Sequence, residues 1–187
     1  VRADVTKQAD IDNLIQQTVE HFGRIDILII NAGGPPPGGF LNLNIDDWER
    51  GVQLTLMSAV RLCYGVVPIM IEQGAGSIVA IESITIKQPV DNLILSNSIR
   101  LAVIGLLKSL ADELGGKGIR VNTVNPTYTL TGRVDQLLTA LAERNGTTVE
   151  EEAANIGSKS PMGRMGTPEE FGRTVAWIAS PAASFIH

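Results

Sequence analysis

The sequence contains one cysteine and two histidines among its 187 residues. A single thiol, Cys63, excludes a disulfide framework and a cysteine-based zinc site. His21 and His187 leave too few imidazoles for a histidine-rich metal centre. We therefore expect no metal site, and we interpret Cys63, which lies in an apolar stretch, as a small core residue.

Aromatic residues are scarce, at 4%, and basic residues do not cluster. The 15 Lys and Arg residues are outnumbered by 20 Asp and Glu, which gives a formal charge of −5. Because nucleic-acid surfaces need clustered Lys and Arg, we expect no nucleic-acid partner. Hydrophobic residues make up 44% of the chain, which is too many for intrinsic disorder, and the length predicts one domain over residues 1–187.

No segment has the pattern of a signal peptide or a membrane anchor. The first residues, 1–4, have no hydrophobic stretch of the kind found in signal peptides. The longest apolar stretch, residues 51–71, is interrupted by Gln53 and Arg61, which favours a buried helix over a membrane span. We therefore expect a soluble cytoplasmic protein without a membrane partner.

Helical and strand patterns alternate along the chain. Short apolar runs at residues 25–30, 77–81 and 119–124 predict buried strands. Longer stretches with apolar residues at helical spacing predict helices over about 46–72 and from the 91–98 region to about residue 114. Such alternation predicts the α/β class: a doubly wound, Rossmann-like parallel sheet in three layers, αβα.

Two details of this pattern concern acidic residues. Asp46 and Glu49 have the spacing of a capping box, which predicts that they begin the first long helix. Glu82, at the end of the second predicted strand, and the run of glutamates at 150–152 are interpreted as solvated carboxylates. Since the carboxyl ends of parallel strands meet at one edge, the loops after residues 31, 81 and 125 should lie together and form the site.

Four segments resemble, in order and at matching spacing, signature segments of the short-chain dehydrogenases/reductases. These segments are Phe22–Gly33, Gly76–Ser83, Ala102–Leu114 and Gly118–Pro126. The resemblance implies an NAD or NADP cofactor, hydride transfer at a carbonyl or alcohol of a small molecule, and a homo-oligomer, either a dimer or a tetramer. Within the family, the chain looks most like the 3-oxoacyl-carrier-protein reductases.

The catalytic positions that the resemblance assigns are largely substituted. The family uses an asparagine, a serine, a tyrosine and a lysine, and here these positions hold Thr55, Ser83, Ser96 and Arg100. A serine hydroxyl is a much weaker acid than a phenol, and an arginine does not release a proton. Tyr128 is the only tyrosine near the expected site, and we interpret it as a packed loop aromatic, with replacement of the lost phenol as the alternative.

The resemblance also implies where a cofactor would lie. The matching positions are Asp4 for adenine, Asn31, Ala32, Gly33 and Arg100 for ribose, and Thr131 for the nicotinamide carboxamide, with Pro126 as a further cofactor-binding residue. Residues 131–166 would form a substrate lid. The family's glycine-rich turn would precede Val1 and its last strand would follow His187, so the expected sheet is incomplete.

Two functions therefore remain open. One is an NAD(P)-dependent oxidoreductase with an altered catalytic set. The other is a non-catalytic dinucleotide-binding scaffold or sensor that retains the fold alone.

Overall fold

A computed structural model describes residues 1–187, apart from the side chain of Arg133. It divides into two compact units, the first formed by Val1–Asn125 with Ile178–His187 and the second by Pro126–Trp177. Each unit contains a hydrophobic cluster of its own.

The first unit is built on a parallel sheet with the strand order β1-β2-β3. The strands are β1 (Ile27–Ile30), β2 (Gly76–Ile81) and β3 (Ile119–Val124). Ile78 of β2 pairs with Leu28 of β1 on one side and with Val121 of β3 on the other. The predicted class, a Rossmann-like α/β fold with a parallel sheet, is confirmed, because each of the three apolar runs forms a strand.

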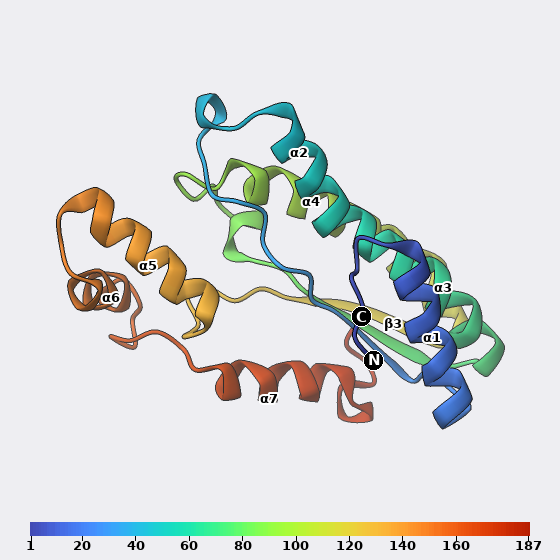
Figure 1. Ribbon diagram of the computed structural model, residues 1–187. Coiled ribbons are helices and arrows are strands. Elements are labelled where there is room, and N and C mark those ends of the chain that lie inside the picture. The colour runs from blue at the N-terminus through green and yellow to red at the C-terminus, as the bar shows by residue number, and fades with distance from the viewer. The chain divides into compact units, whose positions relative to one another are not determined.

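Helices that alternate with these strands cover one face of the sheet. They are α1 (Gln8–Phe22), α2 (Ile45–Gly51), α3 (Ser58–Gln73) and α4 (Ile94–Leu114). Figure 1 shows α1, α3 and α4 together on that face. The capping prediction at the start of α2 is wrong by two residues: the reciprocal bonds join Asn44 and Asp47, because an asparagine in extended conformation caps the helix one step before Ile45.

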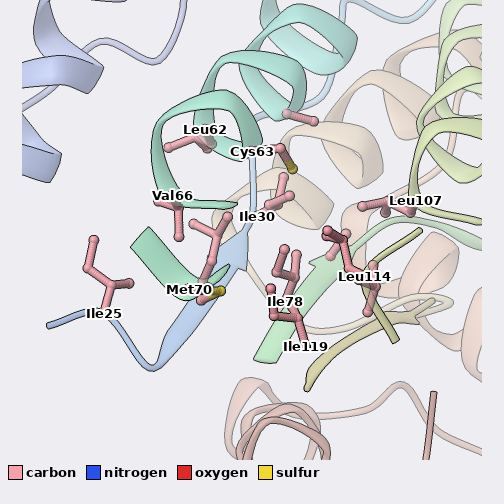
Figure 2. Packing of buried hydrophobic residues seen from close by; sticks show 14 of the residues in the cluster. Ile25, Ile30, Leu62, Cys63, Val66, Met70, Ile78, Leu107, Leu114 and Ile119 are labelled. Atoms are coloured by element: carbon pink, nitrogen blue, oxygen red, sulfur yellow. The ribbon is translucent and has the colours of Figure 1, made fainter. Parts of the chain in front are cut away.

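The core of the first unit lies between the sheet and these helices. Figure 2 shows side chains from both layers meeting there, among them Ile30 and Ile78 from the strands and Val66 and Leu107 from the helices. Cys63 is 4% exposed, which confirms its assignment to the core. The helical stretches Ile45–Gln73 and Ile94–Lys117 are long and apolar enough to cross a membrane by length and composition, and here both supply this core.

The long helical stretch that contains α2 and α3 is interrupted by a wider turn. Val52–Met57 adopts a π-helical conformation between the two α-helices. Just before it, a Cβ on Gly51 would stand only 2.9 Å from Cδ1 of Ile99, so glycine allows α2 to approach α4 closely. Single π-helical turns inside α-helices are frequent at functional sites, and this one carries Thr55.

The C-terminal segment of the first unit is tied to β3 by one guanidinium. Arg120 donates to the backbone carbonyl groups of Ile178, Ala179 and Ser180 and to the hydroxyl of Ser77. These three carbonyls lie at the C-terminal end of helix α7 (Pro168–Ala179). The last carbonyl groups of a helix have no partner within the helix, and here Arg120 donates to them.

The second unit consists mainly of α5 (Gly132–Asn145), α6 (Val149–Ser158) and most of α7. Val134 and Leu138 of α5 meet Ile156 of α6 in its core, and Tyr128 packs against this cluster. Thr167 and Glu170 form a capping box at the start of α7.

One glutamate of the second unit is not solvated as predicted. Glu152 is 5% exposed, and its Oε1 accepts hydrogen bonds from Asn145 Nδ2 at 2.8 Å and Thr147 Oγ1 at 2.7 Å. These two bonds lower the pKa of the carboxyl. The prediction was wrong because the short connection between α5 and α6 folds back and supplies donors that a charge run alone does not indicate.

Candidate active site

Three chain segments leave the sheet at the same edge. Asn31 follows β1, Glu82 and Ser83 follow β2, and Asn125 follows β3. The strands are parallel and in register, so their carboxyl ends share one edge.

The loop after β1 is fastened to the start of α4. The Gly38 amide donates to the Asn92 carbonyl at 2.7 Å, and the Ile94 amide donates to the Gly38 carbonyl at 3.3 Å. Asn97 adds a second attachment, because its side-chain amide both accepts from and donates to the backbone of Val90, at 3.1 and 3.0 Å. The first turns of α4, which carry Ser96 and Arg100, are thereby fixed relative to the edge of the sheet.

Ser83 lies in extended conformation at the beginning of a short helical turn, Ile84–Ile86. Its Oγ accepts a hydrogen bond from the Thr85 amide at 3.2 Å. Within the described residues the hydroxyl hydrogen of Ser83 has no acceptor, so it can be donated to a ligand. This is the property needed of a residue that orients a substrate carbonyl.

Glu82 and Arg100 form a buried ion pair, which corrects the prediction of a solvated carboxylate. Arg100 Nη1 lies 2.9 Å from Glu82 Oε2, and the two side chains are 11% and 3% exposed. Burial raises the pKa of the Glu82 carboxyl, and the attraction of Arg100 only partly offsets this. The carboxylate points into the protein because Arg100 of α4 offers a partner there.

The burial of Glu82 follows from strand periodicity, a signal that the sequence does contain. Successive side chains on a strand alternate between the two faces. Ile78 and Ala80 belong to the core between the sheet and the helices, and Glu82 continues their series beyond the last residue of β2.

Ser96 and Arg100 share a helix face, as their spacing predicts. Arg100 Nε donates to Ser96 Oγ at 3.4 Å, one turn earlier in α4. Ser96, Arg100 and Glu82 thus form one connected series of side chains. A guanidinium that donates to a hydroxyl oxygen makes the hydrogen of that hydroxyl a better donor.

Thr55 lies in the π-helical segment and is 3% exposed. Its Oγ1 is fully buried and has no hydrogen-bond partner among the residues that the structure describes. The same holds for Arg61 Nη1 in α3 and for Thr85 Oγ1 and Asn125 Oδ1, which lie near the ends of β2 and β3. Buried polar atoms without partners are uncommon, so Thr85 and Asn125 leave hydrogen-bonding capacity at this end of the sheet that a ligand can use.

The remaining predicted cofactor residues are distributed over both units. Asp4 is exposed and accepts from the amide and hydroxyl of Thr6 at 3.0 and 2.7 Å, and these bonds lower the pKa of its carboxyl. In the loop after β1, Asn31 and Gly33 are exposed and Ala32 is half-buried. Pro126, Tyr128 and Thr131 belong to the second unit, where Thr131 stands immediately before α5.

Known proteins resemble this chain over its whole length. A family model described as enoyl-(acyl carrier protein) reductase matches residues 1–187. The 3-oxoacyl-[acyl-carrier-protein] reductase FabG of Thermotoga maritima is 30% identical over 183 residues, which cover 98% of this chain and 70% of that protein. The short chain dehydrogenase/reductase astE of Aspergillus oryzae is 32% identical over 188 residues, which cover 100% of this chain and 69% of that protein.

Solved structures agree with the sequence matches. YwfH, an NADPH dependent reductase involved in bacilysin biosynthesis, superimposes with a TM-score of 0.93 at 27% identity, covering 100% of this chain and 72% of that one. L-sorbose reductase from Gluconobacter frateurii, complexed with NADPH and L-sorbose, gives a TM-score of 0.92 at 29% identity, covering 100% and 71%. The fold, the four signature segments and these matches together show that the chain belongs to the short-chain dehydrogenase/reductase family of oxidoreductases.

Proposed function

We propose that this chain is an NAD(P)-dependent oxidoreductase that moves hydride between the nicotinamide and a carbonyl or alcohol. One observation supports the proposal: the loop 31–33 and Ser83 follow neighbouring parallel strands at the same end of the sheet, and Arg100 of α4 is anchored at that end by its ion pair with Glu82. The printed descriptions of the relatives, with NADPH in several structures, support the cofactor class.

The donors present at this edge fit a dinucleotide. A ribose has neighbouring hydroxyls that accept hydrogen bonds, and Arg100 Nη2 makes no hydrogen bond within the described part of the chain. When bound, NAD or NADP would supply the hydride. Arg100 would hold the ribose together with Asn31, Ala32 and Gly33. Asp4 would contact adenine, and Pro126 and Thr131 would contact the nicotinamide.

The chain's own residues would orient the substrate and move the proton. Ser83 donates its hydrogen to the carbonyl oxygen of the substrate. Ser96, whose oxygen already accepts from Arg100, donates its hydrogen through a water molecule to the developing alkoxide and takes up a proton from solvent in the same relay. Tyr128 is the alternative donor, although it packs against the core of the second unit.

Residues 131–166 would cover the substrate as a lid, and α5 and α6 provide its helical frame. The likeness to FabG suggests a 3-oxoacyl type of substrate. We also propose that the protein is cytoplasmic and assembles as a homodimer or homotetramer.

The experiment is a fluorescence titration of the intact protein with NADH and with NADPH, followed by turnover assays on a panel of carbonyl compounds. Arg100→Ala should weaken cofactor binding, while Arg50→Ala, which removes an exposed arginine of α2, should not. Ser96→Ala should slow turnover, and its matched control is Ser98→Ala, because Ser98 bonds only to the Ile94 carbonyl. A well-folded protein that binds neither cofactor would refute the proposal.

A non-catalytic dinucleotide-binding protein is the second candidate. The observation in its favour is that three of the four catalytic positions are substituted and that Thr55, in place of an asparagine, has no hydrogen-bond partner in the described residues. Saturable cofactor binding without turnover on any carbonyl in the panel would support this candidate. Turnover that falls in Ser83→Ala would support the enzyme.

A further inference from the structure

We propose that Glu82 is a positioning residue of the cofactor site. Its buried carboxylate holds the Arg100 guanidinium in one orientation and cancels its charge, so that Arg100 meets a neutral ribose as a hydrogen-bond donor. This inference rests on the proposed function and adds a residue that the family resemblance does not assign.

Glu82 and Ser96 together fix the orientation of the Arg100 guanidinium. Glu82 follows β2 on the core face, and Arg100 reaches it from α4 at 2.9 Å. Arg100 Nε is directed at Ser96 Oγ at the same time. A planar guanidinium held at two of its nitrogen atoms has no remaining rotational freedom, so the direction of its third nitrogen, Nη2, is determined.

One polar atom of each side chain in the pair stays available to bind a ligand. Glu82 Oε1 and Arg100 Nη2 make no hydrogen bond in the described part of the chain. Both atoms retain some contact with solvent, because neither is among the fully buried polar atoms that lack a partner. The pair therefore leaves one acceptor and one donor for a ligand, which suits a hydroxyl group.

Glu82 also balances the positive charge of Arg100. An arginine that is 11% exposed and unpaired would attract an anion from solution, whether chloride or a substrate carboxylate. Arg100 is the charged group that faces Glu82. The π-helical segment contains no charged residue, Lys87 beyond the turn after Ser83 is exposed, and Arg120 stands near the opposite end of β3. Glu82 is thus the counter-charge that keeps anions away from Arg100.

The test measures the affinity for NADH and NADPH at low and high sodium chloride, in the unmodified protein and in Glu82→Gln. The amide retains the shape and removes the charge. We expect Glu82→Gln to bind the cofactor about tenfold more weakly and chloride to compete with the cofactor in this variant. Glu72→Gln, the same change at an exposed glutamate of α3 in the same unit, is the control and should behave as the unmodified protein.

A second measurement needs no variant and covers the case in which Glu82→Gln does not fold. Acidification protonates Glu82, whose pKa is raised by burial, before it reaches ordinary glutamates. Competition by chloride should therefore appear in the unmodified protein on acidification, at a higher pH than the one at which ordinary glutamates take up protons. A purely structural role of Glu82 would change the melting temperature without making cofactor binding depend on chloride.

The outcomes separate the two proposals. If the unmodified protein binds neither cofactor, the proposed function fails, and this inference fails with it. If the unmodified protein binds a cofactor and Glu82→Gln binds it equally well with no greater response to chloride, the proposed function stands and the role of Glu82 is wrong.

Discussion

Two glutamates, one in each unit, are buried to nearly the same extent, but their pKa values are shifted in opposite directions. Glu82 is 6% exposed and Glu152 is 5% exposed. Burial raises the pKa of Glu82 despite its arginine partner, whereas hydrogen bonds from Asn145 and Thr147 lower the pKa of Glu152. Exposed area alone therefore says little about the ionisation of a carboxyl group.

The number and kind of partners explain the difference. Glu152 Oε1 accepts from two donors that are themselves exposed, so the ionised form retains water nearby. Glu82 has one partner, on Oε2, at the edge of the hydrophobic core. A single ion pair rarely compensates two charges for the loss of water, so the neutral form of Glu82 is favoured more than is usual for a glutamate.

The largest effect should come from removing Glu82 entirely. Glu82→Leu leaves Arg100 charged, buried and unpaired, and we expect a loss of about 3–5 kcal/mol in the free energy of unfolding. Arg100→Met should cost less, because Glu82 can take up a proton while arginine cannot release one. Urea unfolding of both variants checks this order. Equal losses would show that removing either partner of the pair costs the same, contrary to the prediction.

A smaller and more local effect is expected from Glu152→Leu. The change removes the acceptor for Asn145 and Thr147, but both donors are exposed and can bind water instead. Faster amide hydrogen exchange should be confined to the connection between α5 and α6. Faster exchange in β2 or β3 as well would contradict the separation of the two units.

The pH dependence of stability should have opposite signs at the two sites. The pKa of Glu82 is higher in the folded chain than the ordinary value of 4.5 that it has in the unfolded chain. The unmodified protein should therefore gain stability relative to Glu82→Gln as the pH falls toward 4.5. Glu152 has a lowered pKa, so its contribution is complete above 4.5 and is lost as the pH falls below that value. Urea unfolding at pH values on both sides of 4.5 measures the two pH dependences, with Glu82→Gln and Glu152→Gln as the reference variants. A change of stability in the same direction at both sites would contradict the opposite pKa shifts of the two glutamates.

The smallest effect should follow from Thr55→Val. The hydroxyl of Thr55 is buried without a partner in the described residues, so replacing it by a methyl group should change stability by less than about 0.5 kcal/mol or raise it slightly. Thr147→Val, which removes a donor to Glu152, should destabilise more. The melting temperatures of the two variants test this order. A clearly lower melting temperature in Thr55→Val would mean that the Thr55 hydroxyl has a partner, such as a bound water molecule.

The sequence alone determined the fold class and most element positions. The apolar runs at 77–81 and 119–124 and the helical spacing up to residue 114 agree with β2, β3 and α4 within a few residues. These features are local, because periodicity reports which face of a strand or helix is apolar. The family followed from the order of four segments, and the roles of Ser83, Ser96, Arg100 and Thr55 remain predictions.

Only the tertiary structure decided how the polar groups at the site are paired. Glu82 and Arg100 are 18 positions apart, and neither residue indicates by itself that the other will neutralise it. The π-helical turn at Val52–Met57 is likewise not indicated by the local apolar pattern, which predicts one continuous helix there. The physical reason is that burying a charge is costly unless a partner arrives from elsewhere in the fold, and only the packing of α4 against the end of β2 supplies that partner.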